Sequence, residues 1–212
     1  MAIVGVGRVE STAAYTLLFS SMVAEIVLID ISKDKSEGES MDLNHAAPLT
    51  SEFQVCLGDS ANCADVAIII ITGGANQKPI QSRMDLVTKN AKIMEQIVPN
   101  IVKHAPDTII LPATNPVDVP TYIAYKTSGF PPERSDRKFD KDALHKIYED
   151  AAENIIQRKG YKAYGIAAGL RHIVKAILRH EVSLLSVSTV GEYFGEKNIT
   201  LSIPTRVGHG AA

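Results

Sequence analysis

In the first 130 residues, short runs of aliphatic residues alternate with helical patterns, and this alternation constrains the fold more than any other feature. The runs predict strands and lie at residues 2–4, 25–30, 66–72 and 108–111. The helical patterns, in which apolar residues recur every three or four positions, lie at 13–21, 34–43 and 86–101. Because short strands joined by helices form parallel βαβ units, the sequence predicts a parallel sheet covered by helices on both faces.

The sequence changes character near residues 129–138, where a glycine, two prolines and a charged stretch follow one another. Further patterns come after it, at residues 141–158 and 164–179 (helices), 184–190 and 199–203 (strands) and 191–198 (turns). We therefore expect an α/β domain of residues 1–134 with a doubly wound parallel sheet. A partial α+β domain, residues 135–212, is expected to follow it.

Composition excludes several classes of protein. The chain of 212 residues has a formal net charge of −2, so it has no basic field to attract nucleic acid or anionic lipid. Its longest apolar run, residues 66–71, is far shorter than a membrane span. The two cysteines, Cys56 and Cys63, have no nearby histidine cluster, which argues against a disulfide framework or a metal site. We expect a cytoplasmic protein with no nucleic-acid or membrane partner.

Gly5 and Gly7 lie where the first predicted strand turns into the first helix. A dinucleotide-binding fingerprint, G-x-G-x-x-G, has its first two glycines there, because they allow a tight turn and a close approach of the backbone to a diphosphate. The third glycine is replaced by Glu10, whose carboxylate would repel phosphate unless an ion pair with Arg8 offsets it. Two glycines alone are also compatible with a simple turn.

Asp30 ends the second predicted strand, at the spacing where an acidic residue accepts hydrogen bonds from the adenosine ribose. A carboxylate there favours NAD over NADP, whose 2′-phosphate it would repel. The alternative is an aspartate that only closes a turn. Together with Gly5 and Gly7, Asp30 predicts a Rossmann-like domain that binds NAD.

Several longer segments carry recognisable motifs. In the first domain they lie at residues 5–15, 25–30, 41–45 (Met-Asp-Leu-Asn-His), 74–79 (Gly-Ala-Asn-Gln-Lys-Pro), 83–87 (Arg-Met-Asp-Leu-Val) and 113–118 (Ala-Thr-Asn-Pro-Val-Asp). Later ones lie at 158–160, 164–167, 175–178 and 185–188. The order and intervals of these motifs resemble those of the L-lactate dehydrogenase family.

The resemblance implies an NAD-dependent oxidoreductase that transfers hydride between NAD(H) and pyruvate or L-lactate. It also implies a homo-oligomer, which is usually a tetramer in this family. The implied cofactor-binding residues are Gly5, Gly7, Val9, Asp30, Thr72, Gly73, Gly74, Asn90 and Asn115. The implied substrate-binding residues are Gln77, Arg83 and Asn115, with Arg83 as the catalytic residue.

The implied roles follow from the chemistry of each side chain. The neutral amide of Gln77 suits the methyl end of pyruvate, whereas a malate dehydrogenase has an arginine there for a second carboxylate. Arg83 would polarise the substrate carbonyl as negative charge develops on its oxygen, and Asn115 would hydrogen-bond substrate or orient the site. Outside these motifs, Arg83 would be interpreted as a surface arginine and Asn115–Pro116 as a turn.

By the same resemblance, a segment is absent after Arg134, and the chain ends before the family's final helix. That segment carries the arginine that binds the substrate carboxylate and a Gly-Glu-His-Gly-Asp motif with the acid/base histidine. None of the six histidines in the sequence stands in such a motif. Loss of an acid/base group costs roughly 10²–10⁴-fold in rate. The alternatives are therefore an inactive NAD-binding remnant and, disfavoured by Gln77, a malate dehydrogenase.

Overall fold

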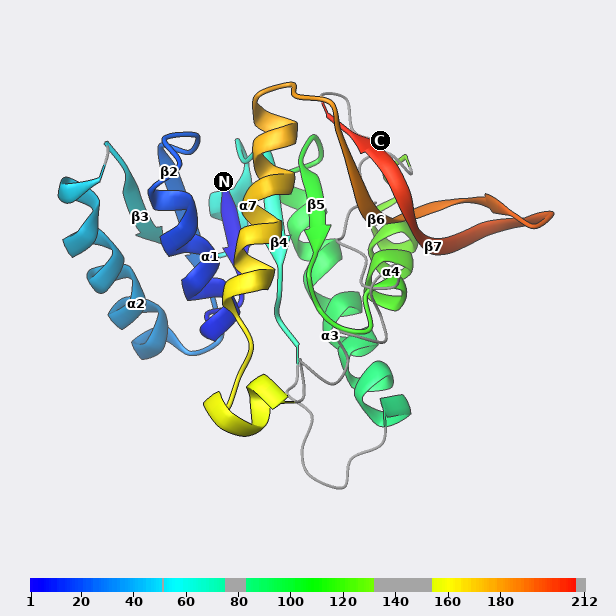
Figure 1. The fold of residues 1–212 in the computed structure, drawn as a ribbon, viewed down its shortest axis with the longest axis horizontal. Coiled ribbons are helices and arrows are strands. Elements are labelled where there is room, and N and C mark those ends of the chain that lie inside the picture. The colour runs from blue at the N-terminus through cyan, green and yellow to red at the C-terminus, as the bar shows by residue number, and fades with distance from the viewer. Residues whose placement is uncertain (51, 75–82, 132–153, 209–212) are drawn as a thin grey trace.

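The computed structural model describes residues 1–50, 52–74, 83–131 and 154–208, and a parallel sheet of five strands forms its centre (Figure 1). The strands are β1 (Ala2–Val4), β2 (Glu25–Ile29), β3 (Gln54–Leu57), β4 (Ile68–Ile71) and β5 (Ile109–Pro112). Their order across the sheet is β3-β2-β1-β4-β5. Because the chain crosses from β3 over to β4 beside β1, the sheet is doubly wound, and the predicted fold class is confirmed.

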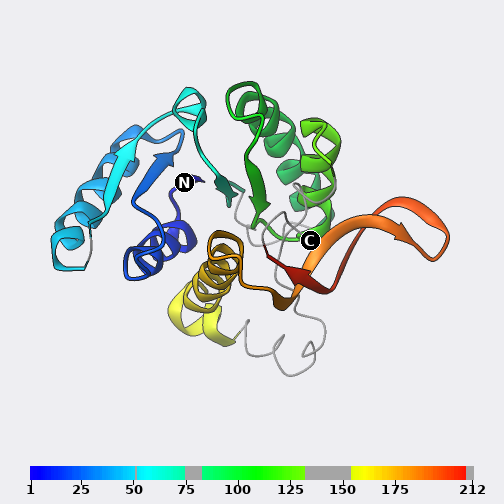
Figure 2. The same ribbon diagram turned by 90° about the horizontal axis from the view of Figure 1, so that it is seen from above.

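Helices join the strands of the sheet. They are α1 (Arg8–Leu18), α2 (Lys33–Ala46), α3 (Arg83–His104) and α4 (Asp118–Ser128), with short 3₁₀ helices at Ala47–Leu49 and Ser60–Cys63. The side chains of β4 alternate between the two faces, since Ile68 and Ile70 belong to one buried cluster and Ile69 and Ile71 to the other. The first cluster lies under α1, and the second lies under α3 and α4 (Figure 2). Burial on both faces explains the unbroken aliphatic sequence of β4.

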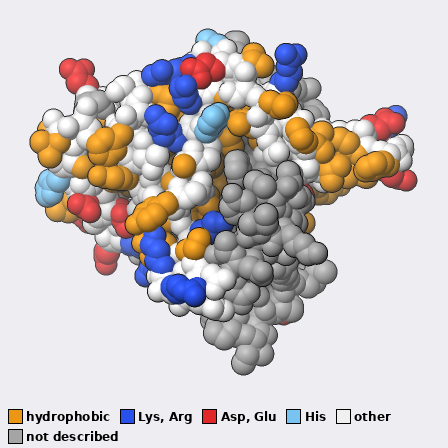
Figure 3. All heavy atoms as spheres, in the orientation of Figure 1, with side chains coloured by type: hydrophobic (Ala, Val, Ile, Leu, Met, Phe, Trp, Pro, Cys, Tyr) orange, Lys and Arg blue, Asp and Glu red, His pale blue; other side chains and the backbone are white. Residues whose placement is uncertain are grey.

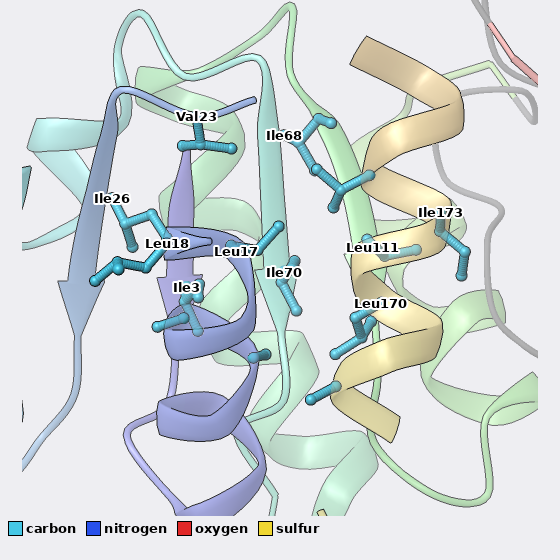
Figure 4. Packing of buried hydrophobic residues seen from close by; sticks show 14 of the residues in the cluster. Ile3, Leu17, Leu18, Val23, Ile26, Ile68, Ile70, Leu111, Leu170 and Ile173 are labelled. Carbon is cyan, nitrogen blue, oxygen red and sulfur yellow. The ribbon is translucent and has the colours of Figure 1, made fainter. Parts of the chain in front are cut away.

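A helix from the second half of the chain also covers the sheet. This helix, α7 (Tyr164–Leu178), lies beside α1 on the first face, where Leu170 and Ile173 join the cluster of Ile3, Ile70 and Leu111 (Figure 4). The helix predicted from the sequence over residues 164–179 is therefore present. The predicted helix at 141–158 lies mostly outside the described residues, of which 154–159 are helical. The domain boundary between residues 134 and 135 stays a prediction.

The C-terminal strands form an antiparallel hairpin that projects from the body of the molecule (Figures 1 and 2). They are β6 (Ser183–Tyr193) and β7 (Glu196–Val207), joined by a turn of two residues, Phe194 and Gly195. Both turn residues have positive φ, 56° and 84°, as a two-residue hairpin turn that matches strand twist requires. The predicted turn therefore lies within 191–198 but is shorter than expected, because pairing across the hairpin extends both strands into that range.

Two elements of the first half were not predicted. Strand β3 lies at the edge of the sheet and is only four residues long, with Val55 its one buried side chain. Helix α4 contains β-branched and aromatic residues and a proline at its third position, so its sequence shows no clear helical preference. In the described part of the chain, no helix combines the length and hydrophobicity that crossing a membrane requires.

Candidate nucleotide-binding and active site

The turn after β1 requires glycine at its first position. Gly5 has a φ of +106°, and its N–H donates to the Ile29 carbonyl of β2 at 2.8 Å. A Cβ atom on Gly5 would lie 3.0 Å from the backbone nitrogen of Gly73. Both the backbone conformation and this close approach exclude a larger residue. The turn after β1 and the turn after β4 therefore touch at the carboxyl edge of the sheet.

Asp30 is joined to the same turn by hydrogen bonds. Its Oδ2 accepts from the Val6 N–H at 2.7 Å, and its Oδ1 accepts from the Ser32 N–H at 2.8 Å. These bonds orient the carboxylate beside the turn after β1. Because each carboxylate oxygen has a further lone pair, both can accept another hydrogen bond from a ligand. Gly5, Gly7 and Asp30 make up what we call the β1–β2 half of the edge.

The first turn of α1 contains Val9, which is half-buried, and Glu10, which is only 8% exposed. The Glu10 carboxylate lies against Gly7, where a Cβ atom would be 2.6 Å from Oε2. Arg8 does not pair with Glu10 among the described residues, because its guanidinium lies over the Tyr161 ring, 4.3 Å from the ring centre. The ion pair with Arg8 that could have offset the Glu10 charge is therefore not formed among the described residues.

A second group of predicted residues meets where β4 and β5 end. The N–H groups of Thr72 and Gly73 both donate to the Val4 carbonyl, at 3.1 and 3.0 Å, and the Thr114 hydroxyl donates to the Gly73 carbonyl at 3.3 Å. A Cβ atom on Gly74 would lie 2.5 Å from Cγ2 of Thr114, so this position also favours glycine. These contacts bring the turn after β4 against the end of β5.

Asn90 connects this region to α3. Its side chain is buried, and Nδ2 donates to the backbone carbonyl of Asn115 at 3.1 Å. Asn115 is exposed and precedes Pro116 in a cis peptide. Asn115 therefore lies at the surface beside Gly74. Thr72, Gly73, Gly74, Asn90 and Asn115 make up the β4–β5 half of the edge.

Of the two remaining predicted site residues, Gln77 and Arg83, the structure describes only the second. Gln77 lies outside the described residues. Arg83 is the first residue of α3, the helix that also carries Asn90. The roles of Gln77, Arg83 and the other site residues therefore stay predictions.

One group near the site was not found from the sequence. The Asp118 carboxylate, at the start of α4, accepts hydrogen bonds from Ser188 of β6 and from Ser202 of β7, the second at 2.9 Å. Asp118 closes the motif that contains Asn115, so these bonds attach the hairpin to the β4–β5 half. The motif itself was a signal for Asp118, but partners 70 and 84 residues away could not be inferred from it.

The surface hollows and the possible metal ligands of the described residues do not indicate a functional site elsewhere than at the carboxyl edge of the sheet. One hollow of about 510 Å³ lies at the end of α2, around Asn44 and Phe53, and one of about 340 Å³ lies between α1 and α7, around Phe19 and Arg171. Neither is lined by a predicted site residue. Within the described ranges, no three His, Cys, Asp or Glu side chains gather in a way that could hold a metal ion.

Two family models match the sequence and together cover the whole chain. The NAD-binding domain of lactate/malate dehydrogenases matches residues 1–135, and the alpha/beta C-terminal domain of the same enzymes matches residues 118–212. The chain belongs to the lactate/malate dehydrogenase family.

Individual relatives narrow this assignment. The chain is 38% identical to a probable L-lactate dehydrogenase of Schizosaccharomyces pombe, with 97% of the chain and 81% of that protein covered. It is 37% identical to the L-lactate dehydrogenase of Acetivibrio thermocellus, with 97% and 85% covered. These matches confirm the resemblance to L-lactate dehydrogenases and the predicted oxidoreductase activity of the family.

Solved structures of the family have the same fold. The minor L-lactate dehydrogenase of Enterococcus mundtii matches with a TM-score of 0.87 and 29% identity, over 98% of this chain and 86% of that one. The malate dehydrogenase of Archaeoglobus fulgidus, solved in complex with NADH, matches with a TM-score of 0.89 and 30% identity, over 100% and 90%. Together with the NAD-binding family model, these matches support NAD as the cofactor of this family member.

The alignments also bear on the segment that the sequence lacks. The alignment to the Schizosaccharomyces pombe protein spans 268 positions, whereas this chain has 212 residues. The relative therefore has residues within the aligned span that have no counterpart here. This agrees with a family segment being absent from the sequence.

Proposed function

We propose that this family member binds NAD(H) along the carboxyl edge of the sheet and reduces pyruvate to L-lactate there. The observation that carries the proposal is the contact between Gly5 and Gly73, which brings the two halves of the edge together. In open parallel sheets, ligands bind at the edge where neighbouring connections run to opposite faces, and β1 and β4 meet at such a point.

The residues of the β1–β2 half fit the adenosine end of the cofactor. Asp30 would accept hydrogen bonds from the ribose hydroxyls, and the glycine turn at Gly5 and Gly7 leaves the backbone open to the diphosphate. The nicotinamide end would then lie near Thr72, Gly74 and Asn115 in the β4–β5 half. When bound there, the cofactor supplies or accepts the hydride.

We assign the choice of substrate to Gln77, whose neutral amide suits the methyl group of pyruvate and offers no charge to a second carboxylate. Arg83, at the start of α3, would stabilise the developing negative charge on the carbonyl oxygen. Reduction adds hydride to the carbonyl carbon and a proton to that oxygen. Because the sequence has no Gly-Glu-His-Gly-Asp motif, water at the site would deliver the proton, and the reaction would be slow.

The absent histidine motif favours a second candidate, an NAD-binding protein without turnover. NADH binding, followed by fluorescence, and pyruvate-dependent oxidation of NADH, followed by absorbance, distinguish the two candidates in a chain of verified mass. Turnover above that of heat-inactivated protein supports the enzyme, and binding without turnover supports the second candidate. Faster turnover of oxaloacetate than of pyruvate would overturn the assignment of Gln77.

We also propose that the chain forms a homo-oligomer in the cytoplasm. Tyr15 and Phe19 support self-association because they stand exposed and in edge-to-face contact on α1, beside the hollow against α7. Light scattering coupled to size-exclusion chromatography measures the mass in solution. A monomeric mass over a wide concentration range would contradict the proposal.

A further inference from the structure

Glu10 is a largely covered acidic residue at the edge of the sheet. It is the third residue of α1 and 8% exposed, and its carboxylate has no hydrogen bond or ion pair with any described residue. Because its oxygens are not among the buried side-chain atoms without a hydrogen bond, the carboxylate stays accessible to solvent and to a ligand at the turn. The field of the helix N-terminus favours the negative charge at this position.

The carboxylate lies on the turn that the cofactor would approach. Oε2 lies so close to Gly7 that a Cβ atom there would be 2.6 Å away, and Gly7 is the residue that precedes the first turn of α1. Acidic residues at the third helical position do bend back in this way when they cap a helix. Here the same bend places a negative charge where a dinucleotide would place its diphosphate.

Nearby cations do not neutralise this charge. Arg8, two residues earlier, stacks on Tyr161, and Lys159 lies over the same ring at 4.3 Å from its centre. Both cations thus contact the Tyr161 ring, and neither forms an ion pair with Glu10 among the described residues. The turn keeps the backbone of a diphosphate site while presenting one uncompensated negative charge to a ligand.

We propose that the Glu10 carboxylate is an internal competitor of the cofactor diphosphate and sets a low affinity of this chain for NAD(H). The inference rests on the proposed function, because it concerns NAD(H) binding at the same edge. Two negative groups a few ångströms apart at a partly buried site repel strongly. The penalty applies to every ligand with a diphosphate, whereas a nucleoside without phosphate escapes it.

Two substitutions separate the charge of Glu10 from its other properties. Glu10→Gln keeps the size and the ability to cap the helix, while Glu10→Ala also removes the bulk. Glu37→Gln, at an exposed position of α2, is the matched control. The probes are NADH, ADP-ribose and adenosine, titrated by calorimetry into each variant and into the unchanged chain. A thermal melt of each variant reports whether it folds.

We expect NADH and ADP-ribose to bind both Glu10 variants about tenfold more tightly or better. Adenosine should bind all proteins equally, and Glu37→Gln should match the unchanged chain. Because the carboxylate has no described partner to lose, the Glu10→Gln variant should melt at nearly the same temperature. A carboxylate that only served the fold would give a lower melting temperature and unchanged binding.

Other outcomes would overturn the proposal. Equal NADH affinity in all proteins would remove Glu10 from cofactor binding and leave the proposed function standing. Tighter binding by Glu10→Ala but not by Glu10→Gln would assign the effect to bulk instead of charge. If no folded variant bound NADH or adenosine, both this inference and the proposed NAD(H) site would fail.

Discussion

The β1–β2 half and the β4–β5 half of the edge differ in how completely this chain supplies them. In the β1–β2 half, Asp30 and Gly5 are held by hydrogen bonds to the backbone between residues at most 24 positions apart. The β4–β5 half joins Gly73, Thr114 and Asn90 from distant segments. Under the proposed function it would also depend on Gln77, outside the described residues, and on a histidine motif that the sequence lacks. Cofactor binding and turnover should therefore respond separately to substitution.

The largest expected effect lies at the start of α3, the helix that carries Asn90 of the β4–β5 half. Arg83→Gln should lower the turnover of pyruvate by about 10²–10³-fold, because a charge opposite the developing oxyanion is lost. The dissociation constant of NADH should stay unchanged, since Arg83 is assigned to substrate. Steady-state kinetics and NADH fluorescence measure the two quantities. Lys89→Gln, at an exposed position of the same helix, is the control. A parallel loss of NADH binding would contradict the separation of the halves.

A smaller effect is expected in the β1–β2 half. Asp30→Asn removes the negative charge of the carboxylate that accepts hydrogen bonds from the Val6 and Ser32 N–H groups and, as proposed, from the ribose. NADH should therefore bind about tenfold more weakly. Turnover at saturating NADH should not change, and discrimination against NADPH should decrease. Calorimetry with both cofactors measures this. Asp34→Asn, exposed on α2, should leave every value unchanged, and an equal effect of that variant would argue against a specific role for Asp30.

The attachment of the hairpin to the β4–β5 half should contribute less. Ser202→Ala removes the 2.9 Å hydrogen bond to Asp118 and should lower the free energy of unfolding by about 1 kcal/mol. Ser186→Ala on β6 provides a comparison without a hydroxyl bond to Asp118. Urea denaturation measures both. The role assigned to Asp118 would be wrong if the two variants lost the same stability.

The smallest effect lies away from both halves. The hydrogen bond from Lys175 at 2.8 Å lowers the pKa of Glu181. A carboxyl with a lowered pKa stabilises the fold above its ordinary pKa, and this stabilisation is lost as the pH falls through the lowered value. Glu181→Gln should therefore be slightly less stable than the unchanged chain at neutral pH and equal to it in strong acid. Denaturant midpoints measured at both pH values test the sign, and a larger difference in acid would contradict it.

Patterns local in sequence predicted most of the sheet and the β1–β2 half. The aliphatic run of β4 indicated burial on both faces, and the position of Asp30 after β2 placed it beside the glycine turn. Strand β3 escaped prediction because an edge strand with one buried side chain shows almost no pattern. For Glu10, the sequence predicted only that its charge would repel phosphate. The contact between Arg8 and Tyr161 was not predicted, because the two residues are 153 positions apart.

In the projecting hairpin, pairing between strands differs from what the preferences of single residues indicate. Phe194 at its tip is 97% exposed, and hydrophobic side chains gather along the hairpin in Figure 3. The sequence indicated a loop there because Gly191 and Asn198 are typical of turns. In the structure both lie in strands, since pairing between β6 and β7 outweighs the preferences of single residues.

The packing of α7 on the sheet determines when, during synthesis on the ribosome, this sheet face can be covered. Strands β1, β4 and β5 leave the ribosome first, yet Leu170 and Ile173 are needed to cover Ile3, Ile70 and Leu111. Until α7 has been synthesised, a nascent chain presents part of one sheet face to the surrounding solvent. Such exposed faces invite chaperones and aggregation. Translation that stops before Tyr164 should therefore yield an insoluble product, even though every strand of the parallel sheet has already been made.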